Sequence, residues 1–365
     1  MKKSTQAPQP RWRRASTLVT YWVGSQFIVE NYRTGKVLSA NPVTARVLHI
    51  FDDWCSFDDA RPALPEYTAQ SIRRTLRQFV SNGLLLIEGS REAKANQAFL
   101  DVWSSWLPHA GMFHFSTKDM PYATSDDETI ARMRAYLKES PQPANFKSLS
   151  TKFTRPSRKL PSPSPPDSEF LCTLVTRRTH REFSTKPLDL SALSTLLRYT
   201  WGLQGFLSDW LLGDLPLKTS PSAGARHPCE VYVFAQRVNG LALGLYHYVS
   251  DRHLLRPISQ AVTRKNGVHY CAGQDWVRGA AALFLITAVL PRSLWKYRFP
   301  RAYRTVLADA AHLCQTFCLV ATHLKLAPFC TMALKDTLIE RDLGIDGISE
   351  TVLYVAGVGL PLPSP

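Results

Sequence analysis

The spacing of apolar positions changes along the chain and separates predicted strands from predicted helices. Residues 279–290 form the longest apolar run, GAAALFLITAVL. This run is too short to span a bilayer and has arginine at both borders, so it predicts a buried strand at 282–290. Residues 303–325 are apolar nearly all round in their second half, which predicts a long helix buried centrally or in a dimer interface. Other segments predict helices at 191–203 and 334–344, and strands at 230–238 and 350–359.

The N-terminal part has the element order of a winged helix. A short strand at 27–31 is followed by helices at 41–54 and 68–83 and by a strand at 84–89. The second helix is amphipathic: one face is apolar, and the other carries arginines. These arginines form either a solvated face or a DNA-reading surface. The first interpretation is favoured, because this small fold often binds peptides and no base-reading residues accompany the arginines.

The alternation of helical and strand patterns predicts an α+β protein. Its length favours more than one domain. The predicted parts are a basic tail at 1–19, a winged-helix-like domain at 20–92, a connecting segment with a Pro- and Ser-rich linker at 93–166, and a larger α+β domain at 167–365.

The charge balance is strongly basic, with 44 Lys and Arg against 29 Asp and Glu and a formal net charge of +15. A basic surface binds nucleic-acid backbones without reading their sequence. It equally attracts an acidic peptide, an acidic partner protein or a cofactor phosphate. The excess is pronounced between residues 251 and 304, so the charge does not by itself indicate nucleic-acid binding.

The cysteines and the N-terminus point to a cytoplasmic chain. Seven cysteines are dispersed and never have the paired CxxC spacing of zinc or dithiol sites, so they predict reduced thiols and no metal site. The basic N-terminus is not followed by the continuous apolar run that a signal peptide needs. No transmembrane segment is predicted.

Two segments of the C-terminal half suit a phosphorylated, flat ligand. Residues 177–183, RRTHREF, bring guanidinium groups and a hydroxyl together after a predicted helix. Arginine forms bidentate, charge-assisted bonds with phosphate and with polar ring edges. Residues 221–234, PSAGARHPCEVYVF, begin with small residues that let the backbone approach a ligand before a strand starts. Taken singly, the first segment is more often a solvated basic cluster, and the second is better explained as a plain tight loop.

Two further segments supply a candidate base and a candidate ligand-binding turn. Lys296 and Tyr297 are adjacent within PRSLWKYRFPRAYR, residues 291–304. A lysine surrounded by like charge gives up its proton more readily, as a general base must. Residues 327–332 predict a turn of small residues between two helices. In such a turn, backbone N–H groups are available to the edge of a ligand. A solvated basic loop remains the alternative for the lysine segment.

Together and in this order, the four segments resemble the SagB-type dehydrogenases, the azoline oxidases of the nitroreductase superfamily. The resemblance covers residues 174–360, with a looser match upstream. It implies a nitroreductase-like FMN-binding fold, with an antiparallel-rich central sheet and helices, in an obligate homodimer. Further shared pieces are the GLYHY segment at 244–248, Ala310 and His312 in the long helix, and the final YVAGVG at 354–359.

The resemblance also assigns roles to individual residues. Lys296 and Tyr297 match the Lys-Tyr pair that family members need for oxidation. Candidate substrate contacts are Arg292, Arg301, Arg304 and His312. The implied FMN contacts are Arg177, Arg178, Thr179 and Arg181 for the phosphate, the ribityl chain and the ring edge, Pro221, Ser222 and Gly224 from the second subunit, and Pro328, Phe329, Cys330 and Thr331 near the ring.

The implied reaction is the oxidation of thiazoline or oxazoline rings in a ribosomally made peptide to azoles. Lys296, helped by Tyr297, removes the acidic α-hydrogen, while the β-carbon delivers hydride to flavin N5. Dioxygen is the expected electron acceptor, since the chain has no GxGxxG dinucleotide fingerprint. The implied partners are a modified precursor peptide and a YcaO-type cyclodehydratase complex; neither a membrane nor nucleic acid is expected.

Three other functions stay open. The flavin reaction could act on a ring held by a carrier protein, or on a peptide without azoles. The chain could be a catalytically silent scaffold whose winged-helix segment recruits a leader peptide, in which case it would lack FMN. A DNA-binding regulator would bind duplex in a salt-sensitive manner and also lack flavin.

Overall fold

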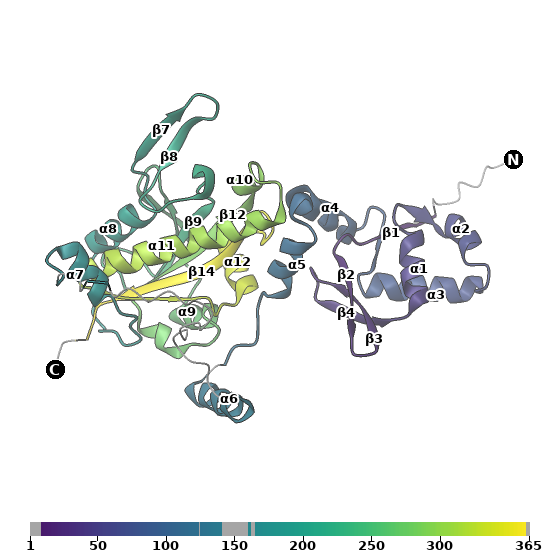
Figure 1. Cartoon of the computed structure of the whole chain (residues 1–365), viewed down its shortest axis with the longest axis horizontal. Helices are drawn as coiled ribbons and strands as arrows, with labels where there is room; N and C mark the ends of the chain where they lie inside the picture. The colour runs from purple at the N-terminus through teal and green to yellow at the C-terminus, as the bar shows by residue number, and fades with distance from the viewer. Residues whose placement is uncertain (1–8, 124, 141–159, 162–164, 363–365) are drawn as a thin grey trace. The chain divides into compact units, whose positions relative to one another are not determined.

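The computed structural model describes residues 9–123, 125–140, 160–161 and 165–362 (Figure 1). Most of the predicted Pro- and Ser-rich linker and the first eight residues of the predicted basic tail lie outside these described residues.

The chain forms two compact units. The first unit contains the residues up to Lys118 together with Leu290–Thr305, and the second contains Asp119–Val289 and Val306–Pro365. The segment that carries Lys296 therefore groups with the N-terminal residues, although the sequence places it in the C-terminal domain. The domain boundaries expected from the sequence stay a prediction.

Two small sheets and an amphipathic helix build the first unit. Strands pair in the orders β2-β3-β4 and β5-β1-β6. Ile72, Leu76 and Phe79 of helix α3 are buried, as the apolar spacing predicts. They pack into a core that includes Val47 and Phe51.

The first unit contains both helices and both strands expected in the winged-helix-like segment, and part of the expected tail, Arg11–Arg14, forms strand β1. The elements are β1 Arg11–Arg14, β2 Leu18–Val23, β3 Gln26–Asn31, β4 Lys36–Ala40, α1 Pro42–Ile50, β5 Cys55–Ser56, α2 Phe57–Ala60, α3 Ala69–Ser81, β6 Leu85–Ile87, α4 Arg91–Trp103, α5 His109–Ser116 and α10 Leu290–Leu294.

A six-stranded antiparallel sheet is the centre of the second unit, with the order β11-β10-β9-β12-β14-β13. Strand β12 is buried along nearly all of its length because helices cover both faces of the sheet. On one face Phe284 packs against Trp201, which ends α8, and against Phe317 of α11. On the other face Leu283 and its neighbours join a core that includes side chains of α9 and α12.

Figure 1 shows helix α11 running along the sheet of this unit. The elements of the second unit are α6 Asp126–Glu139, α7 Glu169–Thr176, α8 Leu190–Thr200, β7 Gly205–Asp209, β8 Gly213–Leu217, β9 Cys229–Ala235, β10 Gly244–Val249, β11 Leu254–Ser259, α9 Arg264–Tyr270, β12 Ala282–Val289, β13 Ala327–Thr331, α12 Asp336–Leu343 and β14 Glu350–Gly359. Helix α11, Tyr303–His323, belongs to this unit from Val306 onward.

The predicted turn at 327–332 is wrong. Ala327–Thr331 form strand β13, which pairs antiparallel with β14. Pro328 is compatible with this strand because β13 lies at the edge of the sheet, where a residue without an N–H is tolerated.

Helix α11 confirms the prediction of a long helix, and one side of it is buried in the core. The stretch Pro300–His323 is long and apolar enough to cross a membrane by length and composition alone. Ala310, Phe317 and Ala321 are, however, almost completely buried, and Phe317 lies in the aromatic core with Phe284. A core helix of a globular domain has these same properties.

Candidate functional site

The basic segment 177–183 follows α7 directly and is anchored by backbone hydrogen bonds. The backbone N–H of His180 donates to the carbonyl of Pro328 in β13 at 3.0 Å, and that of Ser184 donates to the carbonyl of Leu360 at 2.9 Å. Phe183 packs against Phe329, with a ring centroid distance of 5.8 Å. These contacts bring the first and fourth candidate segments together.

The two segments share a cavity of about 770 Å³. Thr179 and Arg181 line it from the basic segment, and Cys330 and Thr331 line it from β13. The guanidinium carbon of Arg181 lies 5.6 Å from the ring centroid of Trp276, within the range of a cation–π contact. The cavity therefore combines a cation, hydroxyl groups and an aromatic wall. We call it the Arg181 cavity; its other lining residues include Tyr122, Ser125, Thr129, Gln274, Asp275 and Ala333.

The other two arginines of the segment, Arg177 and Arg178, have different surroundings. Arg178 is exposed, and its Nη1 donates to the carbonyls of Val175 and Arg177 at 2.9 and 2.7 Å. The positive charge of Arg177 acts to lower the pKa of the Cys318 and Cys330 thiols. Arg177 therefore lies near these two thiols, but it does not line the cavity. Arg178 instead stabilises the backbone of its own segment.

A cluster of three thiols includes Cys330, which lines the cavity. The Sγ atoms of Cys318 and Cys330 are 3.6 Å apart, and the Cys330 thiol also approaches the carbonyl of Cys314. The contact with Cys330, together with burial, raises the pKa of Cys318. Both thiols are therefore protonated at neutral pH and pack as small apolar groups. No group of three or more His, Cys, Asp or Glu suitable for a metal ion occurs in the described part of the chain.

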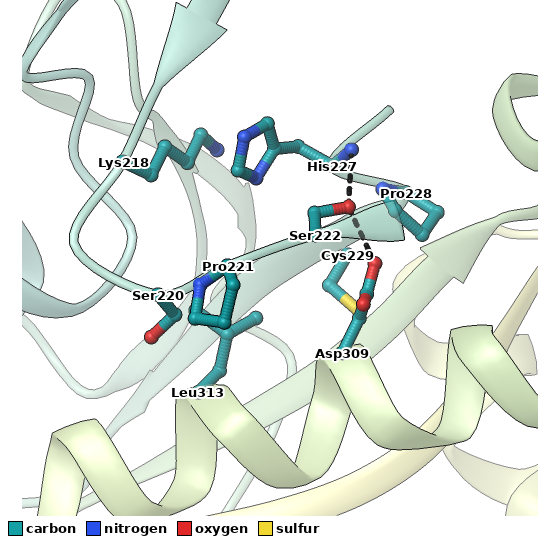
Figure 2. A pocket seen from close by; sticks show the side chains of 9 residues that line it. All are labelled: Lys218, Ser220, Pro221, Ser222, His227, Pro228, Cys229, Asp309 and Leu313. Carbon is teal, nitrogen blue, oxygen red and sulfur yellow. Dashed lines mark hydrogen bonds between the residues drawn. The ribbon is translucent and has the colours of Figure 1, made fainter. Parts of the chain in front are cut away.

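The loop at 221–227 is held by the buried carboxylate of Asp309 on α11 (Figure 2). Ser222 Oγ donates to Asp309 Oδ2 at 2.5 Å and accepts from the backbone N–H of His227 at 2.9 Å. Burial raises the pKa of Asp309, while its hydrogen bonds with Ser222 and with the backbone of Ala223 act in the opposite direction. Gly224 has a φ of 60°, which glycine adopts without strain.

Pro221 and Ser222 line a separate cavity of only about 10 Å³, room for about one water. This cavity shares none of its lining residues with the Arg181 cavity. Within one chain, the second candidate segment therefore does not line the cavity that the first and fourth segments share.

Lys296 and Tyr297 lie in the first unit, directly after α10. The backbone N–H groups of both residues donate to the carbonyl of Ser293, at 3.2 and 2.9 Å. Trp106 Nε1 donates to the carbonyl of Tyr297 at 2.9 Å. The ammonium of Lys296 is exposed and lies 5.7 Å from the Tyr297 ring centroid. The pair thus has an anchored backbone and an accessible amine.

The candidate substrate residues are divided between the units. Arg292, Arg301 and Arg304 belong to the first unit and are exposed, whereas His312 lies on α11 in the second. The positive charge of His312 acts to lower the pKa of Asp309, so these two side chains are neighbours.

Sequence reasoning missed Trp276, Gln274 and Asp309. Trp276 and Gln274 lie in the connection between α9 and β12, where no pattern of spacing marks a site. Asp309 had a usable signal, since it lies three residues before His312 and so shares its side of the helix.

The chain is similar to proteins of known families. Residues 174–360, just over half of the chain, match the model of the Nitroreductase family. The trifolitoxin-processing protein TfxB of Rhizobium leguminosarum bv. trifolii is 25% identical over 321 residues, which are 83% of this chain and 85% of that protein.

Two solved structures are also similar. A chain of the microcin synthetase McbBCD complex of E. coli, with truncated pro-MccB17 bound, is 17% identical, with a TM-score of 0.45 over 66% of this chain and 94% of that chain. A protein described as a nitroreductase from Anabaena variabilis is 27% identical, with a TM-score of 0.45 over 53% of this chain and 38% of that chain.

Proposed function

Because the chain belongs to the nitroreductase family, whose members are FMN-dependent oxidoreductases, we propose that it binds FMN and oxidises a peptide substrate. The observation that carries this proposal is the Arg181 cavity, where the first and fourth candidate segments meet. The finer proposal is that the oxidised group is a thiazoline or oxazoline ring, which becomes an azole.

The residues of the Arg181 cavity fit a flavin mononucleotide in their chemistry. Its volume of about 770 Å³ lies within the range of about 300–1,000 Å³ that is usual for small-molecule sites. Arg181 and the nearby Arg177 would hold the phosphate or the polar ring edge, and Thr179 and Thr331 offer hydroxyl groups. Trp276 supplies an aromatic wall.

The bound FMN would supply a hydride acceptor. The azoline must lose one hydride and one proton to become aromatic, and its α-hydrogen is acidic because an imine and a carbonyl flank it. We assign the removal of this proton to the Lys296 amine. The exposed amine is accessible to a substrate, and the anchored backbone limits the positions that it can occupy.

The proposed assembly is a homodimer in which the loop carrying Pro221, Ser222 and Gly224 completes the flavin site of the second subunit. The absence of this loop from the Arg181 cavity within one chain is compatible with that arrangement. The proposed substrate is a modified precursor peptide, delivered by a YcaO-type cyclodehydratase. TfxB supports a role in processing a natural product, because that relative is similar over most of the chain and is named a trifolitoxin-processing protein.

Turnover of a synthetic azoline peptide tests this function. The wild-type protein should remove two hydrogen atoms per ring, detected by mass spectrometry. Lys296→Ala should slow the reaction by about 10²- to 10⁴-fold while FMN content stays unchanged. Lys94→Ala is the matched control, since Lys94 is also an exposed lysine of the first unit.

Three outcomes would contradict the proposal. A flavin-loaded protein that leaves azolines intact would redirect the search to carrier-bound or non-azoline substrates. An unaffected Lys296→Ala variant would remove the assigned base. A protein that cannot be loaded with FMN would favour the scaffold.

A further inference from the structure

A second cavity in the same unit, of about 560 Å³, has a strongly basic lining. Four cations line it, Arg237, Arg264, Lys265 and Arg278, against the single carboxylate of Asp275. Because the carboxylate balances one cation, the described lining residues carry an excess of three positive charges. We call this cavity the Arg237 cavity.

Arg237 is anchored at the inner part of this cavity. Its Nη2 donates to the carbonyls of Gly279 at 2.6 Å and Ser184 at 3.2 Å. Its Nε is buried and has no hydrogen-bond partner among the described residues. Burial lowers the pKa of Arg237, and the charge of Arg264 lowers it further. Two guanidinium groups are thus held close enough to repel each other, which an anion between them would relieve.

The one carboxylate of the lining is already engaged. Asp275 Oδ1 accepts from Arg278 Nη2 at 2.6 Å, and both side chains are largely exposed. Arg264 donates from Nε to the carbonyl of Gln236 at 3.3 Å, and its terminal nitrogens carry its remaining donors. Thr185 adds a hydroxyl group to the lining.

We propose that the Arg237 cavity binds a phosphate or diphosphate group of a small anionic ligand. Arginine pairs bind such groups through bidentate, charge-assisted hydrogen bonds. Trp276 and Phe183 also line the cavity and offer apolar surface to the remainder of the ligand.

This site adjoins the proposed flavin cavity but has its own set of cations. The two cavities share Asp275 and Trp276, whereas Arg177, Thr179 and Arg181 do not line the Arg237 cavity. Arg181 contacts the Trp276 ring but is not among the residues that line the Arg237 cavity. Binding of a phosphate group in the Arg237 cavity does not depend on the proposed azoline oxidation.

Calorimetric titration of the full-length protein with inorganic pyrophosphate tests the site. The double variant Arg264→Glu/Lys265→Glu should weaken pyrophosphate binding by about 10- to 100-fold, since two attractions become repulsions. Both residues are exposed in the first turn of α9, where glutamate is well tolerated, so the variant should fold. The matched control is Arg252→Glu/Arg256→Glu, which makes the same charge change at exposed positions outside the cavity.

The proposal requires weaker pyrophosphate binding in the cavity variant only, with FMN content equal in both variants. Equal weakening in the control would show a general charge effect and overturn it. Loss of FMN together with pyrophosphate would also overturn it, because the cavity would then belong to the flavin site. A wild-type protein that does not bind pyrophosphate at millimolar concentration would contradict it directly.

Discussion

Asp309 is the buried carboxylate that holds the loop at 221–227. Replacing it with alanine leaves the Ser222 hydroxyl and the Ala223 N–H without their acceptor. We expect Asp309→Ala to lower the free energy of unfolding by about 1–3 kcal/mol and to reduce FMN affinity, because the loop loses its fixed position. Urea denaturation and FMN titration measure these effects. His312→Ala, an exposed neighbour on the same helix, should leave stability nearly unchanged; equal losses in both variants would contradict the role of Asp309.

His114 makes the first unit sensitive to acid. Burial lowers its pKa to about 3, and repulsion from Lys118 adds to this effect. The unfolded chain takes up this proton near pH 6.5, so the unfolded state binds more protons between these values. The stability contributed by neutral His114 is fully present above pH 6.5 and is lost as the pH falls toward 3.

Urea denaturation across this pH range measures the slope. His114 alone should contribute about 1.4 kcal/mol per pH unit within the window. His114→Gln should flatten the dependence, whereas His109→Gln, an exposed position of the same helix, should not. A slope that is identical in all three proteins would show that His114 does not titrate as its burial requires.

At the scale of elements, the pairing of β13 with β14 places the Phe329 ring directly against Gly357. A Cβ on Gly357 would lie 2.3 Å from the Phe329 ring, which also contacts Phe183 and Trp276. Gly357→Ala should therefore displace the ring and destabilise the protein by about 1–3 kcal/mol, with weaker FMN binding. Gly205→Ala is the control, because nothing lies within 4 Å of a Cβ there. Equal stability of the two variants would contradict this packing.

The elements with the clearest apolar patterns could be predicted from the sequence alone, whereas the edge strand β13 could not. Strand β12 comes from a long apolar run, and helix α11 comes from a long segment with apolar residues at helical spacing. Both patterns reflect side chains that pack in the core. Strand β13 was missed because it is short, contains Pro328 and derives its hydrogen bonds from β14, which is distant in sequence.

Only part of the candidate site could be predicted from the sequence. The basic segment and β13 could be named from residue types and order, and the structure brings them to one cavity. Trp276 could not, since its role depends on which elements pack against it, whereas Asp309 had a signal only in its helical spacing from His312.

At the scale of the whole molecule, the proposed flavin site needs two copies of the chain. We expect sedimentation analysis to give a dimer and FMN to dissociate when dilution separates the subunits, because the loop at 221–224 is expected to cover the flavin of the second subunit. A monomer that retains one FMN per chain would contradict this arrangement.

The visible absorption spectrum of the purified protein, with the mass of any released chromophore, tests the central claim most directly. A flavin spectrum and the mass of FMN at one per chain are the predicted results. Arg181→Ala should lower this content, since Arg181 lines the cavity assigned to the cofactor. A colourless protein that cannot be reloaded with FMN would contradict the proposed oxidoreductase.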